Sequence, residues 1–276
     1  MKKFLAVFMA AMLFFALSAC SSNNNNGAQT AIKSPEDLDG KKVAVQMGTT
    51  SDDYISALIK NGKNIEALRY EKVTQCFDDL KLKRVDAVLV DSVVASYYMG
   101  DTATSEIVWK NTEGEPMAIC LKKGNDKLTQ AVEKAIDTLY FNGKIGELAT
   151  KHFGDNYTEG LRKVTEQPVI DKEGLTLVKE GKFMVGMEIG YPPMEYLGKD
   201  GITPAGFDVE VAGEIAKLLG LEVELVDTAW DGIFAGVDTN KYDAIISSVS
   251  ITPERTEAYN LTSAYVSNQL VLVVNK

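Results

Sequence analysis

Short apolar runs alternate with amphipathic stretches from Lys41 onward, a pattern that indicates strands followed by helices. In this first part we expect strands at residues 43–45, 65–70, 86–90 and 118–121. We expect helices at residues 51–59, 74–82, 92–98, 127–141 and 145–153. Gly48 ends the first strand, and Asp52 and Asp53 fall in the first turn of the next helix, where the helix dipole favours acidic side chains.

The same alternation begins again near residue 183. Strands are expected at residues 183–187, 222–226, 243–246 and 269–274, and helices at residues 208–219 and 230–238. The helix at 208–219 carries Val211, Ile215 and Leu219 on one face, and Gly220 follows its last residue. The chain therefore contains two successive α/β segments.

Strands that alternate with helices predict βαβ units, parallel strands and an α/β fold. Residues 84–91 and 241–248 are similar: each has a basic residue, a turn, an Asp-Ala pair and a buried strand that ends in polar groups. Ligands in open α/β sheets bind outside the carboxyl ends of the strands, so we expect one cleft between two lobes. No glycine-rich phosphate motif follows any strand in the sequence, which gives a nucleotide-binding fold no support.

The first thirty residues follow a different pattern. Two lysines precede an apolar run at 4–17, small residues lead to Cys20, and a serine- and asparagine-rich stretch follows. This arrangement resembles a bacterial lipoprotein signal, in which residues 1–19 are removed and Cys20 carries the lipid. Residues 20–31 would then be a flexible tether to the extracytoplasmic face of the cell membrane. The alternatives are an ordinary signal peptide with a chance cysteine, or a retained anchor helix.

Composition narrows the class of partner. The 276 residues carry a net charge of −10, and an acidic surface argues against nucleic acid. Cys76 and Cys120 could form a disulfide in an oxidising compartment, but they lie on predicted elements of different lobes, so we expect two buried free thiols. His152 has no motif around it and is expected to be a surface or hydrogen-bonded residue, not a metal ligand or a base.

A free amino acid needs a cation and N–H donors for its carboxylate and an acceptor for its ammonium. Ser247, Ser248 and Ser250 follow a predicted strand, and Arg255 comes next with a planar fork that suits a carboxylate. The alternative is a surface Arg255 paired with Glu257.

A second polar segment lies between the first strand and the first helix. Gln46, Thr49 and Thr50 surround Gly48 there, where backbone N–H groups attract anions. The alternative is a plain capped turn. Asp91 ends a buried strand and could accept from an ammonium, or it could cap the following helix.

Two aromatic residues are candidate walls of the pocket. Tyr191 precedes two prolines that fix an extended loop, and it follows the strand that carries Glu188. Trp230 opens a predicted helix, and the alternative for it is an ordinary buried core residue.

These segments together resemble the polar amino-acid-binding family of ABC-transporter solute-binding proteins, and the resemblance covers nearly all of the chain after the tether. It implies a two-lobed, type II periplasmic-binding-protein-like fold. It also implies that Arg255 clamps the ligand α-carboxylate with backbone at Thr50 and Ser250, while Asp91 accepts from the ammonium near Ser248. Tyr191 and Trp230 would enclose the ligand side chain, and Glu188 would contact its far end.

The order of the two halves departs from that family. The half resembling residues 183–274 normally comes first, so the chain looks like a circular permutant. We therefore expect one lobe at 32–115 and a contiguous second lobe at 117–276, linked only through residues 113–116. The chain ends near Ser34 and Asn275 would then lie at the hinge.

The resemblance implies a non-catalytic, monomeric binding protein that delivers an amino acid to an ABC-transporter permease, with no cofactor or metal. Glu188 between aromatic walls favours a basic ligand such as lysine or arginine. Cystine or another polar amino acid is the alternative ligand, and a dehydratase-like enzyme on the same fold is the alternative class, with Glu188 as its candidate general acid.

Overall fold

The computed structural model describes residues 31–100 and 104–276. The predicted signal peptide, Cys20 and nearly all of the tether lie outside these ranges. Residues 32–276 form one unit that contains two larger sheets. Within the described ranges, no helix has the length and apolar character needed to cross a membrane.

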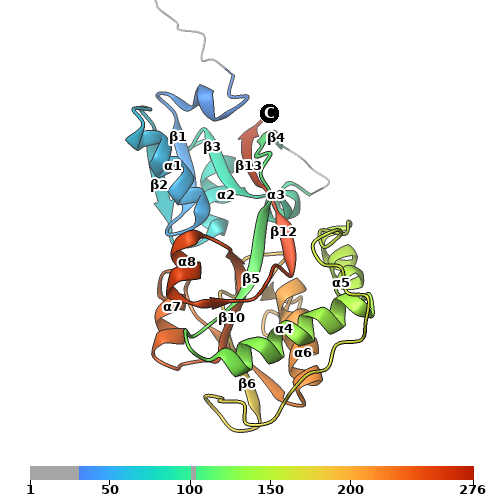
Figure 1. Ribbon diagram of the computed structural model, residues 1–276. Helices are drawn as coiled ribbons and strands as arrows, with labels where there is room; N and C mark the ends of the chain where they lie inside the picture. Colours follow the sequence, from blue (N-terminus) through green and yellow to red (C-terminus); the bar gives the residue numbers. More distant parts are fainter. Residues whose placement is uncertain (1–30, 101–103) are drawn as a thin grey trace, which may run out of the picture. The chain divides into compact units, whose positions relative to one another are not determined.

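The first lobe is built on a five-stranded sheet with the order β2-β1-β3-β13-β4 (Figure 1). Its strands are β1 (Lys42–Gln46), β2 (Glu66–Tyr70), β3 (Ala87–Asp91), β4 (Ser105–Lys110) and β13 (Leu270–Asn275). Its helices are η1 (Pro35–Leu38), α1 (Thr50–Lys60), α2 (Val73–Lys81) and α3 (Ser92–Met99).

The second lobe is built on a sheet with the order β11-β5-β10-β6-β9, and β12 also pairs with β5. Its strands are β5 (Glu115–Leu121), β6 (Lys182–Met187), β9 (Glu222–Asp227), β10 (Ala244–Ser250), β11 (Asn260–Leu261) and β12 (Val266–Asn268). Its helices are α4 (Asp126–Phe141), α5 (Lys144–Phe153), α6 (Phe207–Leu219), α7 (Trp230–Asp238) and α8 (Pro253–Ala258). A two-stranded ribbon joins β7 (Tyr196–Leu197) and β8 (Pro204–Ala205).

The strands and helices predicted from the hydrophobic pattern are all present, with ends shifted by a few residues, and the two lobes confirm the α/β expectation. The expectation of parallel strands is wrong for two of them. β5 runs antiparallel to β10, and β13 runs antiparallel to both β3 and β4. Each sheet thus contains one antiparallel strand, β5 or β13, that the chain reaches by crossing from the other lobe. The hydrophobic periodicity of the sequence does not show which sheet a strand joins.

This exchange of strands corrects the expected lobe boundaries. β13 belongs to the first sheet, so the second lobe is not the whole of 117–276. The chain crosses between the lobes twice: into β5, and from β12 into β13 (Figure 1). The predicted single crossing is therefore wrong. The physical reason is that β13, an apolar strand with five buried residues, completes its hydrogen bonding only between β3 and β4.

The predicted position of the chain ends at the hinge is also wrong. β13 begins opposite Asp91, at the carboxyl end of β3, and its Val274 lies opposite Ala87 at the other end. Ile32 packs against the apolar cluster that includes Val274. Both ends of the described chain therefore lie at the end of the first sheet that is remote from the carboxyl ends of its parallel strands.

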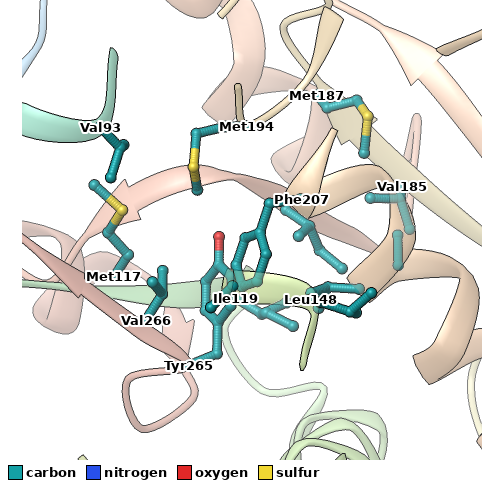
Figure 2. Close-up of a cluster of buried hydrophobic side chains, with 14 of the residues drawn as sticks. Val93, Met117, Ile119, Leu148, Val185, Met187, Met194, Phe207, Tyr265 and Val266 are labelled. Carbon is teal, nitrogen blue, oxygen red and sulfur yellow. The ribbon is translucent and has the colours of Figure 1, made fainter. Parts of the chain in front are cut away.

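Apolar layers cover both faces of each sheet. The largest cluster joins α2 and α3 of the first lobe to α4, α5 and α6 of the second. Figure 2 shows part of it, where Phe207 from α6 stacks on Tyr265 with ring centroids 6.0 Å apart. Met117 and Val266, on the paired strands β5 and β12, lie beside them. This continuous core holds the two crossing strands in place and so sets the position of one lobe against the other.

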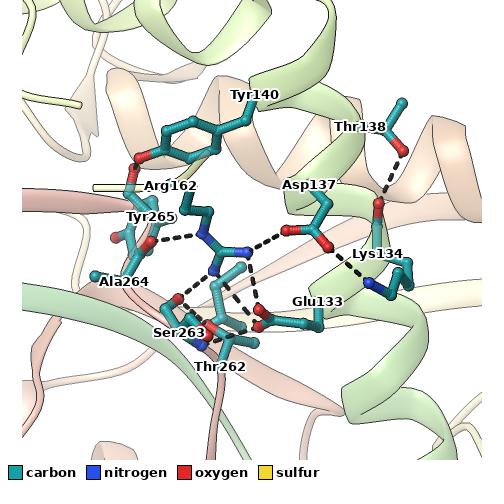
Figure 3. Close-up of polar contacts among 11 residues, drawn as sticks. Glu133, Lys134, Asp137, Thr138, Tyr140, Arg162, Thr262, Ser263, Ala264 and Tyr265 are labelled. Atoms are coloured by element: carbon teal, nitrogen blue, oxygen red, sulfur yellow. Dashed lines mark hydrogen bonds and ion pairs between the residues drawn. The ribbon is translucent and has the colours of Figure 1, made fainter. Parts of the chain in front are cut away.

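The segment between α5 and β6, all of it described, contains no helix or strand and is held by side chains instead. Arg162 is its main anchor (Figure 3). Its guanidinium pairs with Glu133 at 2.9 Å and Asp137 at 2.8 Å on α4, and it donates to the backbone carbonyls of Ser263 and Ala264. The Arg162 side chain is 6% exposed, so these bonds are shielded from water.

The prediction of two buried free thiols is confirmed, and so is the prediction that His152 is hydrogen-bonded. Cys76 and Cys120 are buried and free, and burial raises the pKa of each thiol to about 12. His152 contacts Glu210, with Nε2 and Oε1 3.0 Å apart.

Candidate ligand-binding site

Polar side chains from both lobes converge on one cavity at the carboxyl ends of their parallel strands. Gln46 ends β1, Asp91 ends β3, Glu188 follows β6, and Ser250 ends β10. Carboxyl ends of parallel strands meet at one edge of a sheet, and here two such edges face each other. The cavity has a volume of about 30 Å³ and can hold ordered water.

All of the residues proposed for the site from the sequence line this cavity, together with two that were not proposed, Ser51 and Glu195. The eleven proposed residues are Gln46, Thr49, Thr50, Asp91, Glu188, Tyr191, Trp230, Ser247, Ser248, Ser250 and Arg255. Within the described ranges, no group of three or more histidine, cysteine or acidic side chains is arranged to hold a metal ion.

Direct hydrogen bonds cross the cavity from lobe to lobe. Gln46 Nε2 donates to Glu188 Oε2 at 2.6 Å, and Trp230 Nε1 donates to the Gly48 carbonyl at 3.0 Å. The Tyr191 hydroxyl donates to Asp91 Oδ2. The side chains that line the cavity therefore also hold the lobes together in this arrangement.

Asp91 lies deep in this site, at 7% exposure. Burial raises the pKa of its carboxyl well above the ordinary value, the neighbouring Glu115 carboxylate raises it further, and the hydrogen bond from Tyr191 opposes the shift. Asp91 occupies the N-cap position of α3 but makes no side-chain capping bond. The capping alternative is therefore wrong, and its carboxylate is directed elsewhere.

Arg255 is the cation among the described residues that line the cavity. The Thr252 hydroxyl caps α8 by accepting from the Arg255 backbone N–H, and the Arg255 guanidinium donates to the Ser250 carbonyl at 2.9 Å. The guanidinium lies 5.4 Å from the ring centroid of Trp230 and 5.2 Å from that of Phe234. Burial lowers its pKa, yet a guanidinium stays protonated in proteins. The alternative of a surface pair with Glu257 is not what the structure shows.

The turn at Gly48 is a capped helix start, which was the alternative considered for it. Thr49 caps α1 by accepting from the Asp52 backbone N–H, and the Gly48 N–H donates to the Asp52 carboxylate. Gly48 has a φ of +72°, a left-handed conformation that glycine adopts without strain. The turn is a capped helix start, and Thr49 and Thr50 also line the cavity.

Glu188 is 4% exposed and also lines the cavity. Burial raises the pKa of the Glu188 carboxyl, while the hydrogen bond from Gln46 and the charge of Lys72 oppose the shift. Its Oε1 is buried and has no hydrogen-bond partner among the described residues. Trp230, at 8% exposure, contacts Phe234 edge-to-face at 5.6 Å, so it is at once a core residue and part of the cavity wall.

Three acidic residues were missed by the sequence analysis. Glu195 accepts from Ser247 at 2.6 Å, and it adjoins Asp208, whose pKa burial raises to about 6. Glu115 accepts from the Thr50 hydroxyl and from Ser250 Oγ, the latter at 2.8 Å. Two of the three could have been found from the sequence, because they are acidic residues within otherwise apolar stretches. Glu195 precedes β7, and Asp208 lies on the apolar face of α6.

Part of the chain is similar to known proteins. The family described as bacterial extracellular solute-binding proteins, family 3, matches residues 183–276. The L-cystine-binding protein TcyJ of Escherichia coli (strain K12) is 39% identical over 107 residues, which are 38% of this chain and 40% of that protein. The ABC transporter arginine-binding protein 1 of the same organism is 33% identical over 95 residues, 34% of this chain and 39% of that protein.

Among solved structures, a putative binding component of an ABC transporter from Wolinella succinogenes, complexed with lysine, is 44% identical. The similar part covers 29% of this chain and 34% of that one, with a TM-score of 0.28. The match thus spans less than half the length of each of these proteins.

Proposed function

Because residues 183–276 match the bacterial extracellular solute-binding proteins, family 3, we propose that this chain binds a free amino acid for an ABC importer. The observation that carries the proposal is one cavity lined by a single guanidinium, Arg255, and by an opposing carboxylate, Asp91, from the other lobe. A zwitterion presents the matching pair of charges, and it leaves neither buried charge unpaired.

The α-carboxylate of the ligand would bind at Arg255, helped by backbone N–H groups at Thr50 and Ser250. Thr50 begins α1, so its N–H is one of those that a helix start leaves unbonded. The α-ammonium would bind at Asp91, close to the Ser248 hydroxyl, which is buried and has no partner among the described residues.

The ligand side chain would extend toward Glu188, beside Tyr191 and Trp230. The unpartnered Oε1 of Glu188 suits a lysine or arginine side chain, which brings donors and a positive charge. Lys72 acts on the same carboxylate and weakens this preference, so a polar neutral end such as that of cystine is the alternative ligand.

Binding requires the lobes to separate, because three direct hydrogen bonds between the lobes close the cavity against entry of a ligand. Opening breaks the Gln46–Glu188, Trp230–Gly48 and Tyr191–Asp91 hydrogen bonds. A ligand replaces these bonds with contacts to both lobes at once, and that difference in affinity drives closure around it.

Membrane attachment through a lipid on Cys20, delivery to a permease and a monomeric state are part of the same proposal. The support for the lipid anchor is the cysteine after small residues and the polar stretch behind it. Labelling with a radioactive fatty acid in a bacterial host is expected to mark the wild-type protein and not Cys20→Ala. Equal labelling of both would remove the anchor from the proposal.

We also propose that the order of the two halves is circularly permuted. The ends of the described chain lie at the end of the first lobe that is remote from the cavity, and not at the hinge. Both sheets share one strand order, with an antiparallel strand from the other segment in the fourth place. Both ends of the described chain lie at the same end of the first sheet. A sequence alignment keeps the residues of both chains in order, so it would match only one half of a permuted chain. The match to TcyJ over 38% of this chain is consistent with that.

Titration calorimetry with the twenty amino acids, cystine and ornithine tests the function. We expect one class of amino acid to bind, and Arg255→Ala and Asp91→Asn each to weaken every ligand by about 30-fold or more, because each leaves a buried charge unpaired. Arg84→Ala, at a surface arginine, is the matched control and should bind as the wild type does. Absence of any amino-acid ligand would refute the proposal.

One observation favours an enzyme as a second candidate. Burial raises the pKa of both Glu188 and Glu195, which would favour a protonated carboxyl able to act as a general acid. Incubation with a cyclic amino-acid precursor, followed by NMR, tests for loss of water from it. Turnover that Glu188→Gln abolishes would support this candidate, and no turnover would leave binding alone.

A further inference from the structure

We propose that Asp208, a fully buried carboxylate outside the set of residues that line the cavity, is a positioning residue for amino-acid binding. It holds a bulge of β10 in the form that presents the Ser248 hydroxyl to the ligand ammonium. The inference rests on the proposed function, because that proposal places the ammonium beside Ser248. It gives a role to a residue 40 positions away from Ser248 along the chain.

The bulge lies in the part of β10 that reaches the cavity. The register between β10 and β5 changes between Ile245 and Val249, so residues 246–248 stand opposite a single residue of β5. Two of these residues, Ser247 and Ser248, line the cavity. In a regular strand, consecutive side chains point to opposite faces of the sheet. Extra residues on one strand re-aim its side chains, which allows two consecutive serines to reach one cavity.

Ser248 has a left-handed backbone, with a φ of +50°. A residue that carries a side chain keeps this conformation only where its surroundings hold it there, whereas glycine adopts it without strain. The Ser248 hydroxyl oxygen is buried and has no hydrogen-bond partner among the described residues. A strained backbone that carries an unpartnered hydroxyl at the edge of a cavity points to a contact with the ligand.

Asp208 holds the backbone of Ser248 in this conformation. It lies at the start of α6, and its Oδ2 accepts from the Ser248 backbone N–H at 2.9 Å. Its Oδ1 accepts from the Tyr265 hydroxyl at 2.7 Å, and its own backbone N–H donates to the Met194 carbonyl at 2.9 Å. The carboxylate is thus fixed in place, and without it a buried N–H of the bulge would lose its acceptor.

The two serines of the bulge differ in what their hydroxyls contact. Ser247 Oγ donates to Glu195 Oε1 at 2.6 Å and accepts from the Glu188 backbone N–H at 3.1 Å, so it is used within the protein. Ser248 is held through its backbone N–H, and its hydroxyl oxygen is left over. The ligand ammonium can therefore donate to Ser248 Oγ without breaking a bond inside the protein.

Calorimetry of the full chain with L-lysine, L-arginine and L-cystine tests this role. Asp208→Ala is expected to weaken the amino acid that the wild type binds by about tenfold or more, because Ser248 loses its conformation and the ammonium loses an acceptor. Ser248→Ala should cause a similar loss. The double variant should bind no more weakly than Asp208→Ala alone, because both substitutions remove one and the same contact.

Asp208→Asn is the conservative variant. Its amide oxygen can accept from the Ser248 N–H, and its NH₂ group can donate to the Tyr265 hydroxyl, which accepts as well as donates. It should therefore restore most of the affinity that Asp208→Ala loses.

Asp243→Ala is the matched control for a merely structural loss. Asp243 is buried, directly precedes β10, and accepts from the backbone N–H groups of Val178 at 2.6 Å and Met184 at 2.8 Å. Its substitution removes the same kind of hydrogen bond at the opposite end of the same strand. It should lower the melting temperature and leave the amino-acid affinity within a few-fold of the wild type.

Wild-type affinity in a folded Asp208→Ala protein, or additive losses in the double variant, would overturn the inference and leave the proposed function intact. If Asp208→Ala does not fold, a crystal structure of the wild type with its amino acid decides. Ser248 must then keep its positive φ and its bond to Asp208, and its Oγ must contact the ligand nitrogen; loss of any of these overturns the inference. If no amino acid binds the wild type, the proposed function fails and this inference fails with it.

Discussion

Glu188 is the residue most closely tied to the choice of ligand. It follows β6, its backbone N–H donates to Ser247 Oγ at 3.1 Å, and Gln46 holds one of its oxygens, so its position is set by both lobes. The other oxygen, which lacks a partner among the described residues, is free to meet the ligand. A change at this carboxylate should therefore alter selectivity more than folding.

Glu188→Gln is expected to weaken lysine or arginine binding by about 1.5–3 kcal/mol, through loss of a charge-assisted hydrogen bond. Neutral amino acids should bind within a few-fold of their wild-type affinity. Burial raises the pKa of the wild-type carboxyl, so its charge is lost as the pH falls, at a higher pH than for an exposed glutamate. Basic-ligand affinity should fall with it, and calorimetry at several pH values measures both effects.

Glu180→Gln, at an exposed position, is the control for that change. It should leave both classes of ligand unaffected. Equal losses for basic and neutral ligands in Glu188→Gln would show that the carboxylate serves the structure of the cavity and not the ligand charge.

At the scale of single elements, α7 shows how one helix packs by means of a glycine. Tyr242 precedes β10, and its ring fills the space over Gly186 on β6 and Gly236 on α7, where a Cβ would overlap the ring. Gly232, one turn earlier on the same helix, has nothing within 4 Å of a Cβ. An added methyl group is therefore expected to clash with Tyr242 at Gly236 and to fit without a clash at Gly232.

Gly236→Ala should destabilise the protein by about 1–3 kcal/mol, because the new methyl group displaces a fully buried tyrosine. Gly232→Ala should be neutral or stabilise it by up to about 1 kcal/mol through helix propensity. Urea unfolding measures both free energies. Similar effects of the two substitutions would mean that Tyr242 moves aside at no cost.

The segment between α5 and β6 depends on Arg162 (Figure 3). Arg162→Ala leaves Glu133 and Asp137 without their shielded cation and removes the donors of two carbonyls. We expect a loss of about 2–4 kcal/mol in the free energy of unfolding. Lys163→Ala, at the exposed neighbour, should cost little.

The same network predicts a dependence on pH. Although burial opposes it, hydrogen bonds from Lys134 and Arg162 hold the pKa of Asp137 below its ordinary value. A lowered carboxyl pKa stabilises the fold above the unfolded-state pKa, and that stabilisation is lost as the pH falls through the folded-state pKa. Thermal unfolding from pH 7 to pH 3 should show a smaller loss in Asp137→Asn than in the wild type, and parallel curves would contradict this.

At the scale of the whole molecule, the two chain crossings govern how the lobes can move. Both crossings, into β5 and from β12 into β13, run beside each other because β5 pairs with β12. Paired strands form a narrow ribbon that bends more easily than it shears, so we expect opening about this ribbon. The bonds between Gln46 and Glu188 and between Trp230 and Gly48 are the ones such a motion would break first.

The proposed permutation can be tested by reversing it. A short Gly/Ser linker would join Lys276 to Ile32, and new ends would be opened near Glu166, in the segment without helix or strand. We expect the same circular dichroism, a melting temperature within a few degrees and the same amino-acid affinity. Failure of the reordered chain to fold would show that the two ends of the first sheet cannot be joined.

The sequence by itself determined eight of the thirteen strands and seven of the eight α-helices that the structure describes, and the residues that gather in the cavity. These follow from local rules: period-2 and period-3.6 patterns select the elements, and polar residues after parallel strands lie at one edge of a sheet. Gln46, Asp91, Glu188 and Ser250 were all found in this way.

Only the tertiary structure decided which strands are neighbours and which side chains from the two lobes meet. β13 reads in the sequence as another strand of the second lobe, yet it pairs with β3 and β4 of the first. The sequence places Glu115 in the expected hinge, yet its carboxylate accepts hydrogen bonds from Thr50 of the first lobe and Ser250 of the second. Strand pairing and side-chain contacts join residues far apart in the chain, and their free energy depends on the whole set of partners, which no local pattern contains.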